Sequence, residues 1–238
     1  FPVEGVYGMH NMPGTDVGKI AVRVGPMMAS ADFFFVTVKG VGAHGAFPHT
    51  GIDPIPIAAQ MVTAIQGIVS RNADPMDAAV VSVTQIHGGH TTNVIPEDVT
   101  FSGTTRAFKT EVQDMMERRI REIVEGIAAA HGAKVEYRYD RRYPPTVNSA
   151  EETELAAQAA AEVVGAENVL RDLPPVMGAE DFGWMLKARP GSYVWIGNGA
   201  GEGSCMVHNP RYDFNDRILP IGASYWARLA ERILKKAA

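Results

Sequence analysis

The chain has 238 residues, of which 46% are hydrophobic and 21% charged, and its formal net charge is −5. This balance is typical of a soluble globular protein, and it gives no reason to expect nucleic acid or an anionic membrane as a partner. Cys205 is the only cysteine, which excludes an intrachain disulfide and favours a reducing, cytoplasmic location. No apolar run approaches the ~20 residues of a membrane helix.

The middle of the chain, residues 32–145, is predicted to be a self-contained domain. The first expected strand is rich in aromatic and β-branched residues, the last alternates between apolar and polar residues, and apolar residues recur at helical spacing in the expected helices. In chain order we expect these elements at 32–40, 53–71, 78–86, 98–108, 110–130 and 135–140. The order β-α-β-β-α-β predicts a ferredoxin-like fold with both helices on one face of the sheet.

The two flanks, 1–31 and 146–238, are predicted to form one α/β domain into which the ferredoxin-like domain is inserted, because strands and helices alternate there. In the second flank we expect helices at 151–164, 181–187 and 220–235, and one buried strand at 192–197. The chain begins at Phe1 rather than at methionine, so we expect further residues upstream.

Two histidines far apart in sequence, His10 and His208, are candidate metal ligands. Each follows an apolar stretch and is followed closely by asparagine and proline, which suggests a fixed backbone that aims the ring. A structural role for each histidine is the alternative. No nearby cluster of cysteine, histidine and carboxylates completes the site, so the chain is expected to carry half of a metal centre.

Three residues of the middle domain are candidates for contacts with a substrate. His44 lies in a glycine-rich loop, where an imidazole could hydrogen-bond a developing oxyanion; an exposed hairpin is the alternative. Arg106 lies on a strand, and its guanidinium suits a substrate carboxylate, with a surface ion pair as the alternative. Asn93, in a turn flanked by apolar residues, is the third candidate for a contact with the substrate.

Further polar or glycine-rich segments are weaker candidates. Glu180 and Asp181 stand at the expected start of a helix, where capping alone explains Asp181. The glycine-rich run 197–203 lacks the Lys-Ser/Thr pair of a phosphate loop, so a nucleotide site is excluded there. Cys205 is expected to be an inert buried thiol, because no base accompanies it.

Six segments together, in this order, resemble the M20 family of metal-dependent peptidases and amidohydrolases, in particular its hippurate hydrolases and N-acyl-amino-acid amidohydrolases. They are GVYGMHNMPG, GPMMAS, GVGAHGAFPHTGIDPI, GGHTTNVIPEDVTFSGTTRAF, MGAEDF and CMVHNPRYDFND. The resemblance implies a catalytic α/β domain interrupted by a ferredoxin-like lid through which two copies form a homodimer.

By this resemblance, His10 and His208 would each bind one ion of a two-metal centre containing zinc, manganese, cobalt or nickel. His44 would stabilise the tetrahedral oxyanion, and Asn93 and Arg106 would hold the amide and the carboxylate of the substrate. These lid residues often reach the active site of the partner subunit in the family.

Glu180 and Asp181 match the family's Gly-Ser-Glu-Asp-Phe motif, with Ala179 in place of serine, and would lie in the cleft or next to the metal ligands. In the family the remaining ligands come from an upstream Cys-Gly-His-Asp-x-His segment and the general base from a Glu-Glu pair, and the six matching segments include neither.

The expected function is therefore hydrolysis of N-acyl or N-aroyl amino acids by the full-length protein, with this chain alone inactive. One alternative is a non-catalytic module that dimerises or binds small ligands. The other is a dipeptidase or aminopeptidase of the same family.

Overall fold

The computed structural model describes residues 3–201 and 205–234. The chain forms two compact units. The α/β unit comprises residues 1–28, 146–176 and 181–238, and the ferredoxin-like unit comprises 29–145 and 177–180. The short segment 177–180, which the sequence analysis assigned to the flanking domain, thus packs with the ferredoxin-like unit, where the Ala29 amide donates to the Gly178 carbonyl at 2.9 Å.

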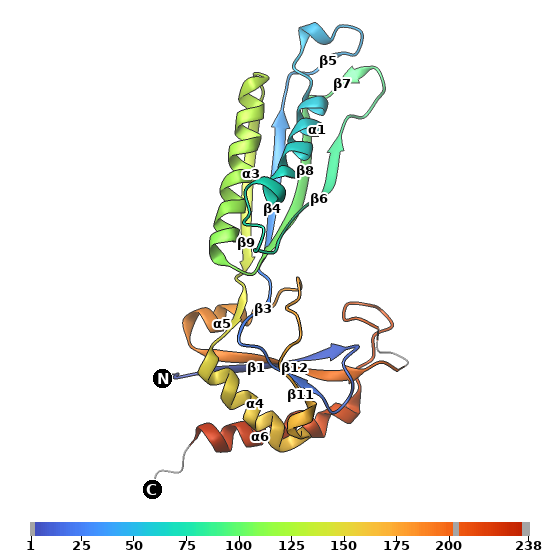
Figure 1. The fold of residues 1–238 in the computed structure, drawn as a ribbon. Coiled ribbons are helices and arrows are strands. Elements are labelled where there is room, and N and C mark those ends of the chain that lie inside the picture. Colours follow the sequence, from blue (N-terminus) through green and yellow to red (C-terminus); the bar gives the residue numbers. More distant parts are fainter. Residues whose placement is uncertain (1–2, 202–204, 235–238) are drawn as a thin grey trace. The chain divides into compact units, whose positions relative to one another are not determined.

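The ferredoxin-like unit contains the predicted order β-α-β-β-α-β (Figure 1). Its main elements are β4 (Ala31–Lys39), α1 (Pro54–Ile65), α2 (Gly67–Arg71), β6 (Ala79–Gly88), β8 (Asp98–Ala107), α3 (Thr110–Ala130) and β9 (Lys134–Tyr143). The four strands are antiparallel in the order β6-β8-β4-β9. The predicted α/β class with a ferredoxin-like insertion is confirmed.

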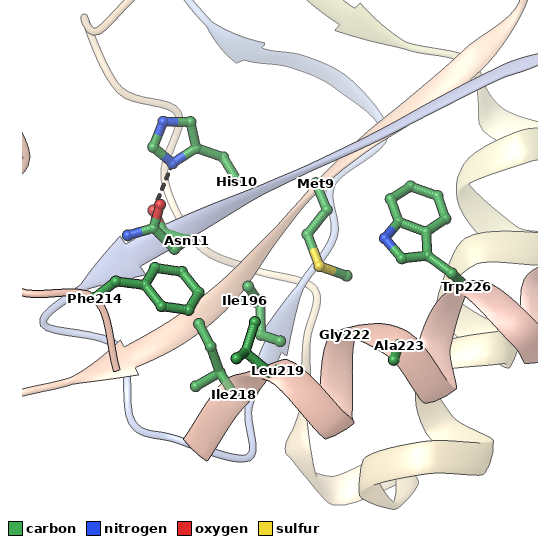
Figure 2. Close-up of a pocket in the computed structure, with 10 residues that line it drawn as sticks. All are labelled: Met9, His10, Asn11, Ile196, Phe214, Ile218, Leu219, Gly222, Ala223 and Trp226. Atoms are coloured by element: carbon green, nitrogen blue, oxygen red, sulfur yellow. Dashed lines mark hydrogen bonds between the residues drawn. The ribbon is translucent and has the colours of Figure 1, made fainter. Parts of the chain in front are cut away.

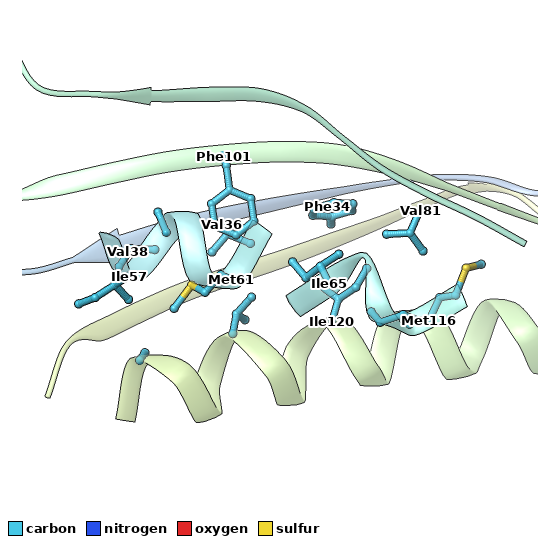
Figure 3. Packing of buried hydrophobic residues seen from close by; sticks show 14 of the residues in the cluster. Phe34, Val36, Val38, Ile57, Met61, Ile65, Val81, Phe101, Met116 and Ile120 are labelled. Atoms are coloured by element: carbon cyan, nitrogen blue, oxygen red, sulfur yellow. The ribbon is translucent and has the colours of Figure 1, made fainter. Parts of the chain in front are cut away.

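One face of this sheet packs on the helices, because successive side chains of a strand point to opposite faces of the sheet. In β4, Phe34, Val36 and Val38 are buried, and they contact apolar side chains of α1 and α3 (Figure 3). Gly103 of β8 lies beneath Phe34, and a Cβ at that position would lie 2.5 Å from the ring. The helix-facing side of the sheet is therefore mainly apolar and buried, and the other side is more exposed.

The predicted helix 53–71 is two helices, α1 and α2, which meet at Gln66. The Asp53 side chain accepts a hydrogen bond from the Ile55 amide at 3.0 Å, so the predicted N-cap is confirmed. The interruption comes directly before Gly67, because glycine has the lowest helix propensity after proline.

A small second sheet extends the ferredoxin-like unit at one end. It pairs β5 (Ala43–His44) with β7 (Val94–Ile95), next to the 3-10 helix Pro48–Thr50. Strands of two residues carry no readable alternation, so the sequence indicated only loops here.

The α/β unit has a four-stranded sheet in the order β1-β12-β2-β11. Its strands are β1 (Val6–Pro13), β2 (Ile20–Ala21), β11 (Val169–Leu170) and β12 (Gly191–Gly199), and β3 (Gly25–Met28) pairs separately with β10 (Thr146–Asn148). Its helices are α4 (Ala150–Val164), α5 (Gly183–Ala188) and α6 (Leu219–Ile233), with 3-10 turns at Ala166–Asn168 and Asp216–Ile218.

The central strand β12 is buried along its whole length and runs parallel to β1. Val194 and Ile196 pack in one cluster with residues of α4 and α6, whereas Tyr193 and Trp195 pack in a second cluster with Phe182. The sheet is thus covered on both faces, as the continuous apolar run of β12 predicted.

The predicted helices of this unit are confirmed with shifted ends. The short helix expected from Asp181 begins at Gly183, and the last helix ends at Ile233, whereas its expected end at Lys235 lies outside the described residues. No helix in the described ranges is both long and apolar enough to cross a membrane.

Candidate functional site

His10 lies near the middle of β1, opposite Trp195 of β12. Its Nδ1 is 2.5 Å from the backbone carbonyl oxygen of Asn11, and the other ring nitrogen is directed away from Asn11 (Figure 2). Because a carbonyl only accepts, Nδ1 is the protonated nitrogen of the neutral ring. The lone pair of Nε2 is therefore available to a metal ion, in the arrangement usual for metal-binding histidines.

A pocket of about 460 Å³ adjoins His10. Apart from His10 and Asn11 it is lined by apolar residues and glycine: Met9, Ile196, Phe214, Ile218, Leu219, Gly222, Ala223 and Trp226 (Figure 2). The Asn11 amide donates to the Tyr212 hydroxyl, so the loop after His208 is bonded to β1. Burial raises the pKa of the Tyr212 hydroxyl, which therefore stays protonated.

His208 belongs to the same unit and has a φ of 68°, the left-handed region. Among the described residues it is the only one other than glycine with positive φ. A strained backbone persists where the surrounding structure holds it, often because a side chain must keep one position. This agrees with the predicted role of the His208 imidazole as a metal ligand. Cys205, expected to be buried, is half-buried.

Glycine at position 208 is expected to give a more stable protein than alanine by about 1 kcal/mol, because a Cβ opposes the left-handed conformation. The His208→Gly and His208→Ala variants of the 238-residue chain would be compared by urea unfolding. Equal stability, or a more stable alanine variant, would show that this backbone conformation is not held in solution.

The described residues do not complete a metal site by themselves. Within 3–201 and 205–234, no three or more histidine, cysteine or carboxylate side chains form a group that could hold a metal ion. His10 fits the role of a ligand by the state of its ring, but two imidazoles fall short of the three or four protein ligands of catalytic or structural zinc.

His44 and Asn93 come together at the β5–β7 end of the ferredoxin-like unit. The Gly45 amide donates to the Asn93 carbonyl at 2.7 Å, and His44 pairs with Val94 in the small sheet. The Ala46 amide donates to Nδ1 of His44 at 3.1 Å. The neutral His44 ring therefore carries its proton on Nε2, where it can donate to an oxyanion.

Arg106 is fixed on β8 by one of its guanidinium nitrogens. Nη1 donates to the Thr104 hydroxyl and, at 2.8 Å, to the Thr105 carbonyl. In the part of the chain that the structure describes, Nε and Nη2 of Arg106 make no hydrogen bond. Burial lowers the pKa of this guanidinium and the nearby Asp32 opposes the shift, so Arg106 remains a cation.

The structure separates Arg106 from the pair His44 and Asn93. β8 starts at Asp98, beside the small β5–β7 sheet, and Arg106 lies eight residues further along (106 − 98 = 8), near the opposite end (Figure 1). A rise of about 3.4 Å per residue makes this about 27 Å. A small substrate molecule cannot span that distance within one ferredoxin-like unit.

Glu180 and Asp181 directly precede Phe182, the residue before α5. The Trp184 amide donates to the Asp181 carbonyl at 2.9 Å, whereas the N-cap position of α5 is Phe182, without a side-chain cap. The helix thus begins later than predicted, with Phe182 rather than Asp181 at the N-cap position. Strand β12 ends at Gly199, within the glycine-rich run 197–203. Residues 202 and 203 of this run lie outside the described residues.

A buried polar cluster around Asp32 was not predicted from the sequence. Its carboxylate accepts hydrogen bonds from Gln113 Nε2 at 2.8 and 2.9 Å and from the Tyr139 hydroxyl at 3.0 Å, and all three residues belong to the ferredoxin-like unit. The available signal was Gln113, a polar residue three positions before Met116 on the apolar stripe of α3.

Comparisons with known proteins place these features in a family. The profile of peptidase family M20/M25/M40 matches residues 1–232. The chain is 37% identical to the N-acetylcysteine deacetylase of Bacillus subtilis, covering 98% of this chain and 60% of that protein. It is also 37% identical to the hippurate hydrolase of Campylobacter jejuni, covering 99% of this chain and 61% of that protein.

Among solved structures, the YXEP protein of Bacillus subtilis, described as a dinuclear metal-binding peptidase of family M20, superposes with a TM-score of 0.79. It is 31% identical, and the match covers 99% of this chain and 58% of that one. The chain thus spans about 60% of the length of the curated relatives reported above. It belongs to peptidase family M20/M25/M40.

Proposed function

We propose that the complete protein hydrolyses the amide bond of N-acyl or N-aroyl amino acids such as hippurate, in a metal-dependent reaction. The observation that best supports this proposal is the hydrogen bonding of the Arg106 guanidinium. With Nη1 bonded to the protein, the edge formed by Nε and Nη2 faces no described hydrogen-bond partner and suits a carboxylate bound through two parallel hydrogen bonds. The relatives named above for hippurate and N-acetylcysteine support the substrate class.

Two divalent ions per subunit (zinc, manganese, cobalt or nickel) are proposed for the complete site, with His10 and His208 each binding one. Bound ions of this kind polarise a carbonyl and lower the pKa of a water molecule. The contribution of this chain is to present Nε2 of His10 as a ligand. Glu180 and Asp181 are proposed to lie in the cleft or next to the metal ligands.

In this proposal the ferredoxin-like unit contributes the polar contacts to the substrate. His44 donates its Nε2 proton to the oxygen that becomes negative when the amide carbon is attacked. Asn93 binds the substrate amide, and Arg106 binds its carboxylate. Holding the substrate at both ends orients the reacting bond, which reduces the entropic part of the barrier.

The length of β8 supports the proposed homodimer. Arg106 lies about 27 Å along the strand from the end that carries His44 and Asn93, so one substrate cannot contact all three residues of a single copy. Two copies related by a two-fold axis solve this, because His44 and Asn93 of one copy then act with Arg106 of the other. We further propose a cytoplasmic location, in agreement with the single cysteine.

The test is an assay of glycine release from hippurate by the complete protein, loaded in turn with each of the four metals, beside the 238-residue chain under the same conditions. We expect turnover by the complete protein and none by the chain, because the segments that supply the family's other ligands and its general base are not among those matched in the 238 residues. Sustained turnover by the chain contradicts the second expectation. Binding without turnover by the complete protein supports a non-catalytic module, and cleavage of unblocked dipeptides alone supports a dipeptidase.

A further inference from the structure

The open face of the ferredoxin-like sheet carries two exposed phenylalanines, Phe33 and Phe35. They follow from the alternation of β4, in which Phe34 points into the core and its neighbours point away from it. Their side chains remain partly accessible, with 37% and 36% of the residue surface exposed. The two rings are thus equivalent in strand, face and exposure, but they differ in their neighbours.

Phe33 is the ring next to Arg106. In the register of β4 and β8, Phe33 lies opposite Thr104, which is two residues before Arg106 on the same face. The Thr104 hydroxyl donates to the Asp32 carbonyl at 2.8 Å and accepts from Nη1 of Arg106. These bonds hold the guanidinium carbon of Arg106 5.9 Å from the centre of the Phe33 ring. The ring and the cation therefore form one fixed surface.

Phe35 has a different environment. It lies opposite Ser102, and the guanidinium carbon of Arg138 lies 4.0 Å from its ring centre. Arg138 is itself paired with Asp140. Phe35 is therefore covered by an arginine that already has a carboxylate partner, whereas Phe33 is next to an arginine with an unused edge.

We propose that Phe33 is a specificity-determining residue, an apolar surface that contacts the side chain of the amino acid whose carboxylate binds Arg106. This inference rests on the proposed function. A carboxylate bound through two N–H···O bonds of about 2.8 Å places its α-carbon about 5–6 Å from the guanidinium carbon. The Phe33 ring centre lies 5.9 Å from the same guanidinium carbon, so a long side chain that extends from that α-carbon across the guanidinium can reach the ring. The substrate class is thereby narrowed to N-acyl derivatives of apolar and aromatic amino acids.

A second cation beside Phe33, Arg142, affects whether a charged or an apolar substrate side chain is favoured there. The guanidinium carbon of Arg142 also lies 5.9 Å from the Phe33 ring centre, which disfavours a lysine or arginine side chain there by like-charge repulsion. An acidic side chain would require Arg142 as its partner. Arg142 already pairs with Asp140 at 3.7 Å, so its charge is partly compensated, and an apolar side chain is favoured.

The test compares two substrates that differ only in the amino-acid side chain, N-acetyl-L-phenylalanine and N-acetylglycine, in the metal-loaded complete protein. In Phe33→Ala we expect the ratio of kcat/KM values, phenylalanine over glycine substrate, to fall about tenfold, as for the loss of an apolar contact in a specificity pocket. Phe33→Leu should retain most of the ratio. The matched control Phe35→Ala should leave it unchanged.

Three results would contradict the proposed role of Phe33. An equal loss on both substrates in Phe33→Ala would show a structural role, and an unchanged ratio would show that Phe33 does not contact the substrate. A wild-type preference for N-acetyl-L-glutamate over both substrates would assign the site to acidic side chains instead. In these cases amide hydrolysis persists and only the role of Phe33 is overturned, whereas hydrolysis of neither substrate by the wild type overturns the proposed function itself.

Discussion

Replacing Asp32 with alanine is expected to lower the free energy of unfolding of the ferredoxin-like unit by about 3–5 kcal/mol, the largest stability effect that we predict. Asp32 is completely buried, and its carboxylate is the acceptor for Gln113 and the hydroxyls of Tyr139 and Thr105. Each buried donor that loses its acceptor costs about 1–3 kcal/mol, because no water replaces it. Gln113 is itself 3% exposed, so its amide has no access to solvent.

The pKa of the Asp32 carboxyl predicts how the free energy of unfolding depends on pH. Burial raises the pKa of this carboxyl, and the hydrogen bonds from Gln113 and Tyr139 offset only part of the shift. A pKa that is higher in the folded state means that the folded state binds the proton more tightly than the unfolded chain. The stabilisation from this proton is present below the unfolded pKa and is lost as the pH rises through the folded pKa.

Asp32→Asn is the matched control, because it keeps the shape and an acceptor oxygen but cannot ionise. Near neutral pH it should be within about 1 kcal/mol of the wild type, since removing a buried charge offsets the altered hydrogen bond. Its unfolding free energy should lack the part of the pH dependence that Asp32 causes. Urea unfolding between pH 3 and 8 measures both effects. An alanine variant as stable as the asparagine variant would show that the cluster contributes little.

Replacing His10 with alanine is expected to lower kcat/KM of the complete, metal-loaded protein at least ~100-fold, because the loss of the proposed metal ligand would remove several kcal/mol of charge stabilisation. The affinity for the metal should fall as well, and isothermal titration with zinc measures it. Stability should change by less than about 1 kcal/mol, since the only described hydrogen bond of the ring is to the adjacent Asn11 carbonyl.

A suitable control is His131→Ala. His131 is exposed and its Nε2 lies 2.7 Å from the side-chain oxygen of Gln60, so it is a histidine with a partner but outside the proposed site. This variant should keep both activity and metal affinity. Unchanged metal binding in His10→Ala would leave His10 with a structural role only, the alternative considered from the sequence.

Two of the longest elements of the ferredoxin-like unit were predicted from the sequence to within one residue of their observed ends. β4 is rich in aromatic and β-branched residues, and α3 repeats its apolar stripe over 21 residues. The ten-residue strand β9 was predicted too short, and the eight-residue strand β1 was not among the predicted elements. The two-residue strands β5 and β7 carry no period, and their pairing depends on contacts between segments about fifty residues apart. The same limit applies to the break at Gln66, which follows from one unfavourable glycine.

For the candidate site, the sequence by itself determined the identity of the chemical groups, because His10, His44, Asn93 and Arg106 stand in recognisable local motifs. The tertiary structure alone decided their states and places. Backbone contacts fix which nitrogen of each histidine carries the proton, and the hydrogen bonds of Nη1 fix which edge of Arg106 is left for a ligand.

The placing of groups along the sheet was also decided by the tertiary structure. Strand register puts Phe33 beside Arg106, and the length of β8 puts His44 and Asn93 at its far end. Local sequence specifies which residues face the same side of a strand, whereas pairing with distant segments sets which of them become neighbours. That is why the sequence could indicate the residues of the proposed site, while their grouping, and the buried Asp32 cluster, emerged only from the fold.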